Sequence, residues 1–531
     1  MGEMMSIEIM NKVYSFIDAI QTITPKASFY NTKDQRVSEL KKIHNQIKDI
    51  DEDLYKLFLF YPGINDYNKL NIMGSVLSQK SMSFLTMPVV TDDVKELLAH
   101  DSFISILRNT SYARVLRFFL ELKERKVNNK RLKKTVLNFI LRDPKLISRS
   151  VKYRTKIRDL LTHVYGLKTS SLLCSFLSLK AGSSPSIEKT LRKEVYRYSS
   201  LSKEELKDFF MFVFKVPVTE YSVEIYTVYK EAHKDIEKGS SLPYETLLGI
   251  RNAHYKDYDL KNIFEKTSKT MTKSQKITLQ RSSEKRGVKI STDFSGYDSV
   301  KLYKYAYERG WSEEIKQAID KSVRKSLSKF QMDLKDICLV VDNSQSMEGR
   351  SDSKNDPISR VMSISKFLEL SSESCKYFFT GKTENTELPT VGGESSLGRT
   401  LIRALKEKPD TVFILSDGYE NAPEGMTDLV IKGVQKIGLN TNIVHINPVF
   451  AAESSKVRSL SNKIATLPLY DLNQLEGIFM KSLLEKNSLE GIKFLKKFLF
   501  VKAYKHFGIS LSDELKKEIE DQSIIDFQTL L

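Results

Sequence analysis

The stretch that decides the fold of the second half of the chain is Ile337-Cys338-Leu339-Val340-Val341-Asp342-Asn343-Ser344-Gln345-Ser346. Its first five residues form a continuous apolar run, which is typical of a strand buried on both faces. The polar loop that follows carries one carboxylate and two hydroxyls at alternate positions. Because three oxygens at this spacing can face one point, and hard oxygen ligands suit Mg²⁺, the loop predicts a magnesium site formed by Asp342, Ser344 and Ser346.

Strand-like and helix-like patterns alternate on the carboxyl side of this loop. The segments are, in chain order, 357–370 (helix), 375–380 (strand), 396–406 (helix), 411–416 (strand), 427–436 (helix) and 442–447 (strand). Alternation of helices with buried strands predicts a doubly wound α/β domain, with a parallel sheet covered on both faces. Ligands bind beyond the carboxyl ends of the strands in such a sheet, so we expect the functional residues there.

Two more polar segments fall at that expected edge. The run 411–416 ends at Asp417-Gly418, and Val391-Gly392-Gly393-Glu394-Ser395-Ser396 is a glycine-rich loop that opens a helix. The order of D-x-S-x-S, glycine-rich loop and strand-end Asp resembles the metal-ion-dependent adhesion site of von Willebrand factor A domains. The resemblance implies that Ser344 and Ser346 bind the metal directly, and that Asp342 and Asp417 hold it directly or through water.

The glycine-rich loop departs from that family at one position. The Thr that the family usually has falls on Glu394, with Ser395 next to it, so both join the candidate metal ligands. An extra carboxylate could occupy the coordination position that an acidic partner normally fills. Alternatively, the loop bends away and Glu394 is solvated. Both interpretations are open, and they decide whether a magnesium ion is bound.

Other kinds of chemistry find little support in the sequence. The segment from Gly393 to Thr400 has Arg399 where a phosphate-binding P-loop needs Lys, and no good strand precedes it. A metal-dependent nuclease or phosphatase needs a nucleophile and a general base beside the ion, and neither is recognisable. Three distant cysteines and seven scattered histidines suggest neither a disulfide framework nor a zinc site. We therefore expect a protein that is not an enzyme and that lies in the cytoplasm, because no leader or spanning segment is recognisable.

The first half of the chain has a helical pattern. Apolar residues recur at three and four positions up to about residue 330, and short breaks such as 143–144 and 239–243 separate the helices. This pattern predicts an all-α, HEAT-like array of antiparallel helix pairs. We expect domains at 1–332 (helical), 333–485 (α/β) and 486–531 (C-terminal helical extension), with 266–289 as a long exposed loop.

The positive charge is concentrated in one part of the helical half. Residues 333–485 hold 17 Lys and Arg against 21 Asp and Glu, whereas 114–158 hold 16 bases and three acids. So dense a positive segment repels itself unless an anion is present, and RNA or DNA phosphate is the leading candidate. The interleaved aromatics Phe118, Phe119, Phe139 and Tyr153 are more typical of a core than of base stacking. The candidate RNA-binding residues are Arg114, Arg117, Lys123, Arg125, Lys126, Lys130, Arg131, Lys133, Lys134, Arg142, Lys145, Arg149, Lys152, Arg154, Lys156 and Arg158.

Two further segments carry a wider resemblance. Gly310-Trp311-Ser312-Glu313-Glu314-Ile315 opens a helix that leads straight into the D-x-S-x-S strand, and Leu242-Pro243-Tyr244-Glu245-Thr246-Leu247-Leu248 is followed by Arg251-Asn252. These segments, after some three hundred helical residues, resemble the TROVE-domain family of Ro autoantigen proteins. The resemblance implies a monomeric HEAT-repeat ring closed by the A domain, which binds small noncoding Y-like RNA and single-stranded ends of misfolded RNA.

Two functions follow from these patterns. The first is an RNA-binding scaffold in RNA quality control or processing, with an exoribonuclease or another RNA-processing protein as a candidate partner. The alternative is a metal-dependent interaction adaptor, in which the A domain docks an acidic residue of a protein partner. Charge separates the two, because an adaptor does not need the positive segment at 114–158.

Overall fold

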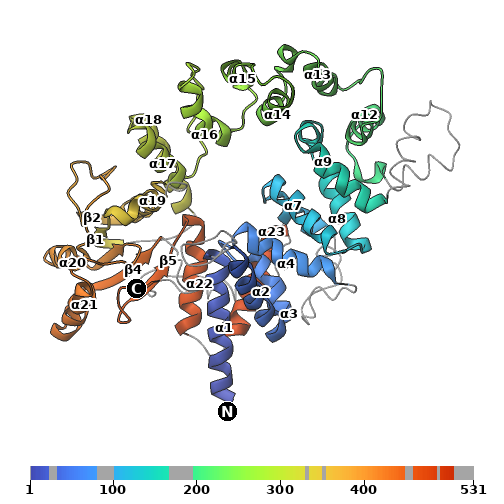
Figure 1. Cartoon of the computed structure of the whole chain (residues 1–531). Helices are drawn as coiled ribbons and strands as arrows, with labels where there is room; N and C mark the ends of the chain where they lie inside the picture. The colour runs from blue at the N-terminus through green and yellow to red at the C-terminus, as the bar shows by residue number, and fades with distance from the viewer. Residues whose placement is uncertain are drawn as a thin grey trace. The chain divides into compact units, whose positions relative to one another are not determined.

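The computed structural model describes residues 2–22, 33–79, 101–166, 195–328, 334–349, 354–448, 458–486 and 491–507. The chain divides into two compact units. Unit 1 combines Met1–Ile72 with Phe294–Leu531, and unit 2 is Met73–Asp293. Figure 1 labels the elements of both.

A five-stranded parallel sheet forms the centre of the α/β part of unit 1, with the strand order β2-β1-β3-β4-β5. The strands are β1 (Leu334–Val341), β2 (Ser372–Phe379), β3 (Thr411–Leu415), β4 (Asn442–Asn447) and β5 (Ala465–Pro468). The predicted α/β fold is confirmed. The sequence patterns missed only β5, a four-residue strand at the sheet edge whose residues are mostly part-exposed and therefore show no buried apolar run.

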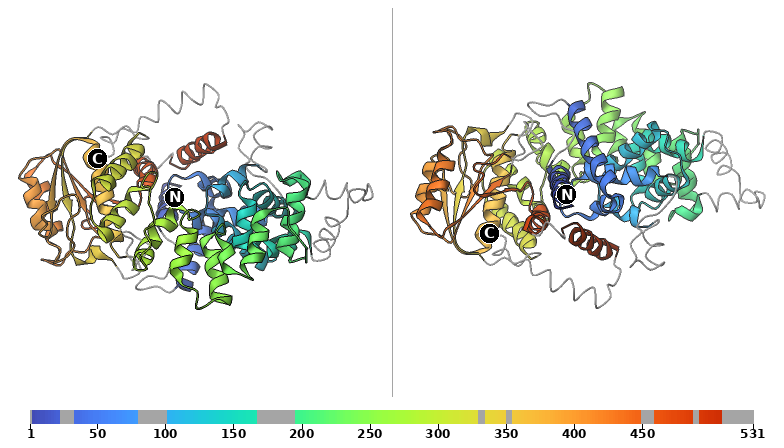
Figure 2. Two further views of the ribbon diagram at one scale, coloured as in Figure 1. Left: turned by 90° about the horizontal axis from the view of Figure 1, so that it is seen from above. Right: turned by 90° about the horizontal axis from the view of Figure 1, so that it is seen from below.

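Helices cover both faces of this sheet (Figure 2). On one face, α20 (Leu397–Leu405) and α21 (Met426–Ile437) bury Leu401 and Ile431 in one core with Val340 and Val412. On the other side, α19 (Asp356–Leu370) packs on β1 and β2, and α17 (Ser299–Arg309) and α18 (Glu313–Leu327) pack on α19. The central strands β1, β3 and β4 are thus buried on both faces, which explains why they read as apolar runs.

The two ends of the chain pack together in unit 1. The participating helices are α1 (Gly2–Thr22), α2 (Lys33–Ile50), α3 (Glu52–Leu57), η1 (Phe58–Phe60), α22 (Leu475–Lys486) and α23 (Gly491–Phe507). The Tyr14 hydroxyl donates to the Leu484 carbonyl at 2.8 Å, and the Lys481 ammonium lies 2.7 Å from the Asp18 carboxylate. Both contacts join α1 to α22, so two helices far apart in the sequence stabilise each other.

The compact units differ from the domain boundaries expected at 332 and 485. Secondary structure changes near both positions, but residues 1–72 belong with the α/β part and not with the other helices. Helix α23, the described part of the expected C-terminal extension, packs on α3 and η1, where Lys496 pairs with Asp51. A helical hydrophobic pattern shows that a helix buries one face, and it does not show which distant segment covers that face.

Unit 2 is all helical. Its described elements, besides the end of α4 (Asp66–Ser78), are α6 (Asp101–Arg108), α7 (Tyr112–Glu124), α8 (Lys130–Leu141), α9 (Leu146–Tyr165), η2 (Tyr196–Tyr198), α12 (Lys203–Phe214), α13 (Glu224–Ala232), η3 (Ile236–Gly239), α14 (Tyr244–His254), α15 (Leu260–Thr267) and α16 (Lys273–Glu284). Helix α9 packs on α7, α8, α12, α13 and α14, as expected for successive helix pairs. None of the described helices in either unit is long and apolar enough to cross a membrane.

The expectation of a long loop at 266–289 was wrong. Most of it is helical, because Thr272 caps α16 by accepting from the Gln275 backbone N–H at 3.3 Å while the Gln275 side chain accepts from the Thr272 N–H at 2.8 Å. This capping box stabilises a helix whose composition is polar. The polar composition of the segment led to the prediction of a loop, whereas the capping residues Thr272 and Gln275 specify the helix α16.

Candidate functional site

Asp342 stands at the centre of the polar edge of the sheet, directly after β1. Its carboxylate is fully buried. One oxygen accepts from the Ser344 backbone N–H at 3.0 Å and from the Thr380 hydroxyl at 3.3 Å. The other accepts from the hydroxyls of Ser416 at 2.8 Å and Ser395 at 3.2 Å. Residues from the ends of β1, β2 and β3 and from the glycine-rich loop therefore meet, as the parallel sheet predicted.

Asp417 supplies a second carboxylate at the same edge. It is 6% exposed and accepts hydrogen bonds from the Ser346 side chain and, at 3.0 Å, from the Tyr419 backbone N–H. The Ser344 and Ser346 hydroxyls are 3.2 Å apart. Burial and the nearby Asp342 carboxylate raise the pKa of Asp417 to about 6. Two buried carboxylates thus share one small polar region, and a cation there would offset their repulsion.

The glycine-rich loop reaches this edge through Ser395. The loop is held by hydrogen bonds from the Gly392 N–H to the Asn343 carbonyl at 2.9 Å and from the Gln345 N–H to the Gly393 carbonyl at 3.1 Å. Gly393 has a φ of +80°, which favours glycine. Glu394, the next residue, is exposed, whereas Ser395 is buried against Asp342. Of the two interpretations of Glu394, this geometry fits the solvated one.

The arrangement suits a hard cation. Throughout the described ranges, no group of three or more His, Cys, Asp and Glu side chains could hold a metal ion. The edge of the sheet instead offers two carboxylates and three hydroxyls, which is an all-oxygen donor set of the kind Mg²⁺ prefers. We call this group the strand-edge cluster; its members are Asp342, Ser344, Ser346, Ser395 and Asp417.

Sequence reasoning missed two hydroxyls that contact the strand-edge cluster, those of Thr380 and Ser416. Both are the last residues of predicted strand runs, so the rule that strand ends gather at one edge would have found them. Behind the cluster, the buried His445 ring lies 3.2 Å from the Ser416 carbonyl, and burial lowers its pKa to about 4. His445 is therefore neutral at pH 7 and supports the strand end without adding charge.

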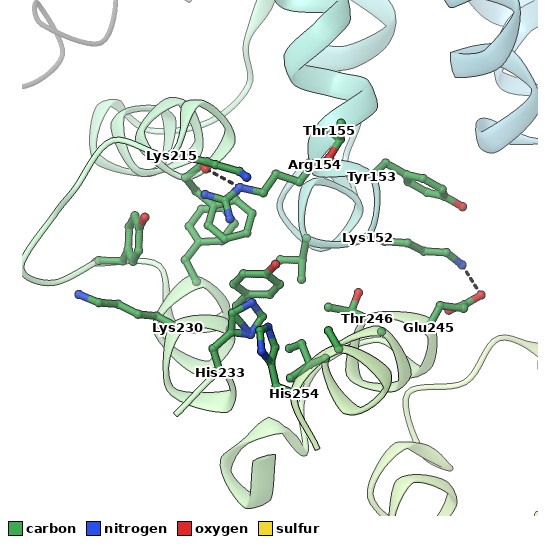
Figure 3. A pocket seen from close by; sticks show the side chains of 18 of the residues that line it. Lys152, Tyr153, Arg154, Thr155, Lys215, Lys230, His233, Glu245, Thr246 and His254 are labelled. Atoms are coloured by element: carbon green, nitrogen blue, oxygen red, sulfur yellow. Dashed lines mark hydrogen bonds and ion pairs between the residues drawn. The ribbon is translucent and has the colours of Figure 1, made fainter. Parts of the chain in front are cut away.

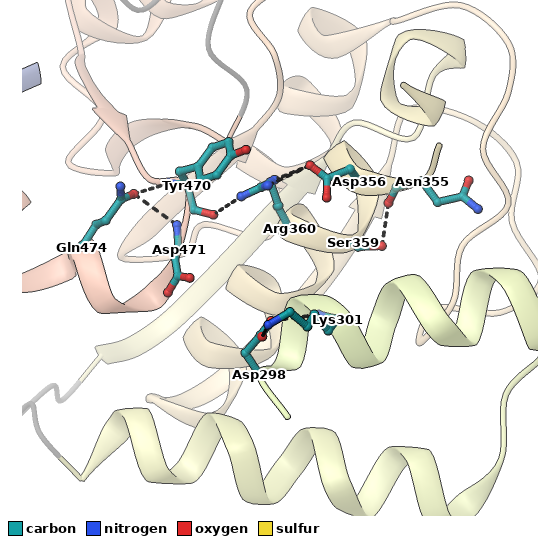
Figure 4. Close-up of polar contacts among 9 residues, drawn as sticks. All are labelled: Asp298, Lys301, Asn355, Asp356, Ser359, Arg360, Tyr470, Asp471 and Gln474. Carbon is teal, nitrogen blue, oxygen red and sulfur yellow. Dashed lines mark hydrogen bonds and ion pairs between the residues drawn. The ribbon is translucent and has the colours of Figure 1, made fainter. Parts of the chain in front are cut away.

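A polar network connects the start of α19 to the segment before α22 (Figure 4). The Asn355 N–H donates to the Glu348 carbonyl at the start of α19. One turn later, Arg360 pairs with Asp356 at 2.7 Å and donates to the Tyr470 carbonyl, also at 2.7 Å. These contacts anchor the start of α19 within unit 1.

A second candidate site lies in unit 2, as a cleft of about 1000 Å³ (Figure 3). Its walls come from α9, α12 and the segment after it, α13 and α14. Basic and aromatic side chains dominate the lining: Lys152, Arg154, Lys156, Lys215, Lys230, His233, Lys234 and His254, with Tyr153, Phe212, Tyr221, Tyr226 and Tyr229. Glu245 is the only acidic residue among the described lining residues. We call this site the cationic cleft.

Some of these bases are held by the protein itself. The Arg154 Nε donates to the Phe212 carbonyl at 2.8 Å, and its guanidinium lies 4.2 Å from the centre of the Phe212 ring. Lys152 pairs with Glu245 at 2.5 Å, which neutralises the acid. Lys215 and Lys234 are exposed. The cleft therefore keeps a positive surplus at the side facing solvent.

The sixteen predicted RNA-binding residues fall into different environments. Lys152, Arg154 and Lys156 line the cationic cleft. Arg131 and Arg149 make structural contacts, because Arg131 donates to the Val76 carbonyl at 2.8 Å and Arg149 pairs with Asp143 at 2.8 Å. The exposed members are Arg114, Arg117, Arg125, Lys126, Lys130, Arg142 and Lys145, and the part-exposed ones are Lys123, Lys133, Lys134 and Arg158.

The aromatic residues of this segment behave as the sequence suggested. Phe118, Phe119 and Phe139 are buried, and the Phe119 and Phe139 rings meet edge to face at 5.7 Å. Only Tyr153 reaches the cationic cleft. The core of α7 and α8 thus uses the aromatics, and the aromatics of the cleft come from later helices that the sequence reasoning did not single out.

Comparisons with known proteins add little to this geometry. No family model and no curated protein matches the chain. Among solved structures, it is similar to the crystal structure of the Ro (RSR) protein of Deinococcus radiodurans, with 12% identity and a TM-score of 0.27 over 78% of this chain and 96% of that one. That protein is a Ro protein.

Proposed function

We propose that this protein is a nonenzymatic RNA-binding protein whose cationic cleft holds the sugar-phosphate backbone. The observation that carries the proposal is the lining of the cleft, which gathers basic side chains from α9, α12, α13 and α14 around a single, already paired carboxylate. Lysine and arginine bind phosphate by releasing condensed counterions, without reading sequence. Aromatic residues beside them suit unpaired bases.

The volume and the charge of the cleft are compatible with a stretch of a nucleic acid strand. A volume of about 1000 Å³ lies at the upper end of small-molecule pockets, and the cleft is lined by cations at its exposed side. Exposed bases on α7 and α8, such as Arg114, Arg117 and Lys130, add positive surface elsewhere in unit 2. We therefore assign single-stranded RNA, including the ends of misfolded RNA, to the cleft, and structured Y-like RNA to the wider basic surface.

The strand-edge cluster is assigned a bound Mg²⁺. Its two buried carboxylates and three hydroxyls match the oxygen ligands of this ion, which would supply positive charge between Asp342 and Asp417. Asp342, Ser344, Ser346 and Asp417 would hold the ion, with Ser395 supporting Asp342. The role is structural or adhesive and not catalytic, since the carboxylates are engaged by hydroxyl and backbone donors.

The alternative function, an interaction adaptor, draws on one observation. Ser346 is exposed while Asp342 and Ser344 are buried, so an ion in the cluster could be reached from solvent by an acidic side chain of a partner. An exoribonuclease or another RNA-processing protein would be a suitable partner for an RNA-bound, monomeric cytoplasmic protein of the Ro type. In that case the cationic cleft would bind the RNA and the strand-edge cluster would bind the protein partner of the same complex.

The test replaces three bases of the cleft that make no ion pair among the described residues. The full-length variant Lys156→Gln/Lys215→Gln/Lys234→Gln is compared with wild type for binding of a labelled U-rich 20-mer at 50 to 300 mM salt. We expect affinity at low salt to fall about 10- to 100-fold, and the slope of log K against log salt to fall by about 2, as three lost contacts to a single strand imply.

The matched control removes three exposed lysines from the α/β part, in the variant Lys408→Gln/Lys432→Gln/Lys436→Gln. It changes net charge equally and should leave RNA affinity within about twofold of wild type. Equal losses in the two triple variants would reduce the effect to net charge. An unchanged affinity in the cleft variant would exclude the cleft as the RNA site.

A further inference from the structure

Two histidines face each other in the cationic cleft. His233 caps the C-terminus of α13 and His254 ends α14, and their ring centres are 5.3 Å apart (Figure 3). The Tyr229 ring lies 4.7 Å from His233, and the Tyr255 hydroxyl donates to the His233 carbonyl at 2.9 Å. The pair thus has a fixed position in the cleft, while both side chains remain exposed to solvent.

Three of the elements that line the cleft contribute cations. Helix α9 contributes Lys152, Arg154 and Lys156, the end of α12 contributes Lys215, and α13 contributes Lys230 and Lys234. The Lys230 ammonium is turned away, because it donates to the Val218 carbonyl at 2.9 Å.

Three acids of the elements that carry the pair are held in ion pairs, and Asp235, two residues after His233, accepts from the Glu237 backbone N–H at 3.0 Å. On α14, Glu245 pairs with Lys152. On α13 and η3, Glu231 lies 3.8 Å from Lys238, and Glu237 lies 2.7 Å from Lys266. None of these three carboxylates is therefore available to stabilise a charged imidazole. The pair instead meets positive neighbours: burial, His254 and Arg154 together lower the pKa of His233.

A bound anion would favour the charged form of the imidazole, which the positive neighbours disfavour. We infer that His233 and His254, with Arg154, form a proton-linked phosphate site, at which an RNA phosphate binds as the histidine pair takes up a proton from solvent. The inference rests on the proposed RNA binding and names the group that the cleft binds. A phosphate presents several acceptor oxygens, so it can receive N–H bonds from two imidazoles. The positive surroundings make a metal cation between the same two rings unfavourable.

Proton uptake has a measurable consequence. If one proton is taken up with each bound RNA, affinity rises about tenfold for each unit by which pH falls, over the range between the pKa values of His233 in the free and in the RNA-bound protein. Lysines and Arg154 keep their charge across this range, so they contribute affinity without pH dependence. The pH dependence therefore isolates the histidine pair from the rest of the cleft.

The experiment measures binding of a 12-nucleotide oligo-U RNA to the full chain between pH 5.8 and 8.0 at constant ionic strength. Wild type should bind at least about tenfold more tightly at pH 6 than at pH 7.5, with calorimetry in two buffers of different ionisation enthalpy showing proton uptake. His233→Gln/His254→Gln should bind with a nearly flat pH profile. His163→Gln, whose ring contacts the Val127 carbonyl outside the cleft, should keep the wild-type profile.

The outcomes separate this inference from the RNA proposal. Lys234→Gln should weaken binding at all pH values and leave the pH profile unchanged. RNA binding with the same pH profile in wild type and in the double histidine variant overturns the proton-linked site alone. No RNA binding at any pH overturns both. If inorganic phosphate titrates the histidine NMR signals and oligo-U does not compete with it, the ligand is free phosphate, and the assignment to RNA fails.

Discussion

The strand-edge cluster and the cationic cleft carry opposite charge in opposite environments: the cluster buries negative charge, and the cleft exposes positive charge. The cluster buries two carboxylates and satisfies them with hydroxyl and backbone donors, so its geometry is complete before any ion arrives. The cleft leaves its surplus charge exposed and holds only part of it, through Arg154 and Lys152. The difference matches the two proposed ligands, one small cation at the cluster and an extended anion in the cleft. The two sites should therefore respond independently to substitution.

The largest expected effect is the loss of Mg²⁺ binding in Asp342→Ala. This change removes the central acceptor of the cluster, and we expect Mg²⁺ affinity by calorimetry to fall at least about 100-fold, because hard cations depend on charged oxygen ligands. RNA affinity should stay within twofold of wild type. Glu373→Ala, which removes an exposed carboxylate from the opposite end of β2, is the control. A parallel loss of RNA binding would break the independence of the two sites.

A smaller effect is expected in Asp417→Asn, and it has the opposite sign. Burial and Asp342 raise the pKa of Asp417 from 3.8 to about 6, so the native state binds more protons than the unfolded state between these values. Stability therefore falls as pH rises through this window. At pH 7.5 without Mg²⁺, the asparagine should stabilise unit 1 by up to about 3 kcal/mol, at 1.36 kcal/mol per pKa unit.

The measurement is denaturant unfolding with EDTA, followed by the fluorescence of Trp311, the single tryptophan of the chain, which lies in unit 1. The stabilisation should disappear below pH 4, where both states are protonated. Saturating Mg²⁺ should reverse the order, because wild type alone gains the full ligand set. Destabilisation of the metal-free variant at pH 7.5 would show that Asp417 is not strained by its neighbour.

The smallest effects distinguish two adjacent residues of the glycine-rich loop. Ser395→Ala removes a donor from the buried Asp342 carboxylate and should cost about 1 to 2 kcal/mol by the same Trp311 measurement. Glu394→Thr alters an exposed side chain and should change stability by no more than about 0.5 kcal/mol. Mg²⁺ affinity should also stay near wild type in Glu394→Thr. A large change there would restore the interpretation in which Glu394 occupies the metal.

The two regions also differ in how well the sequence predicts them. The cluster is built largely from short contiguous motifs at strand ends, so Asp342, Ser344 and Asp417 could be placed on one edge from the pattern alone. The cleft draws on α9, α12, α13 and α14, and its bases at Lys215 and Lys234 lie some sixty residues or more from the predicted positive segment. The density of positive charge in the sequence identified α9 as one wall of the cleft. The other walls come together with α9 only through the packing of the helices, which the charge pattern does not show.

Two further differences between the predicted and the observed structure have separate causes. The capping pair Thr272 and Gln275 specifies a helix that composition alone assigned to a loop. Packing of α1 on α22 depends on residues at opposite ends of the chain, and a hydrophobic face does not identify its partner. Sequence thus predicted the kinds of element well, and long-range pairing of helices poorly.

The packing of the chain ends has a consequence for synthesis. Asp18 and Lys481, which pair at 2.7 Å, are separated by 463 residues. At roughly 5 to 20 residues per second, a ribosome needs about 20 to 90 s to make the second after the first. Unit 2 is fully translated during that interval, so the polar contacts of α1 with α22 form only after it has been made. The Phe16 ring of α1 meets the rings of His44, Tyr55 and Phe58, which are made soon after it. The apolar contacts of α1 with its sequence neighbours can therefore form well before its polar links to α22.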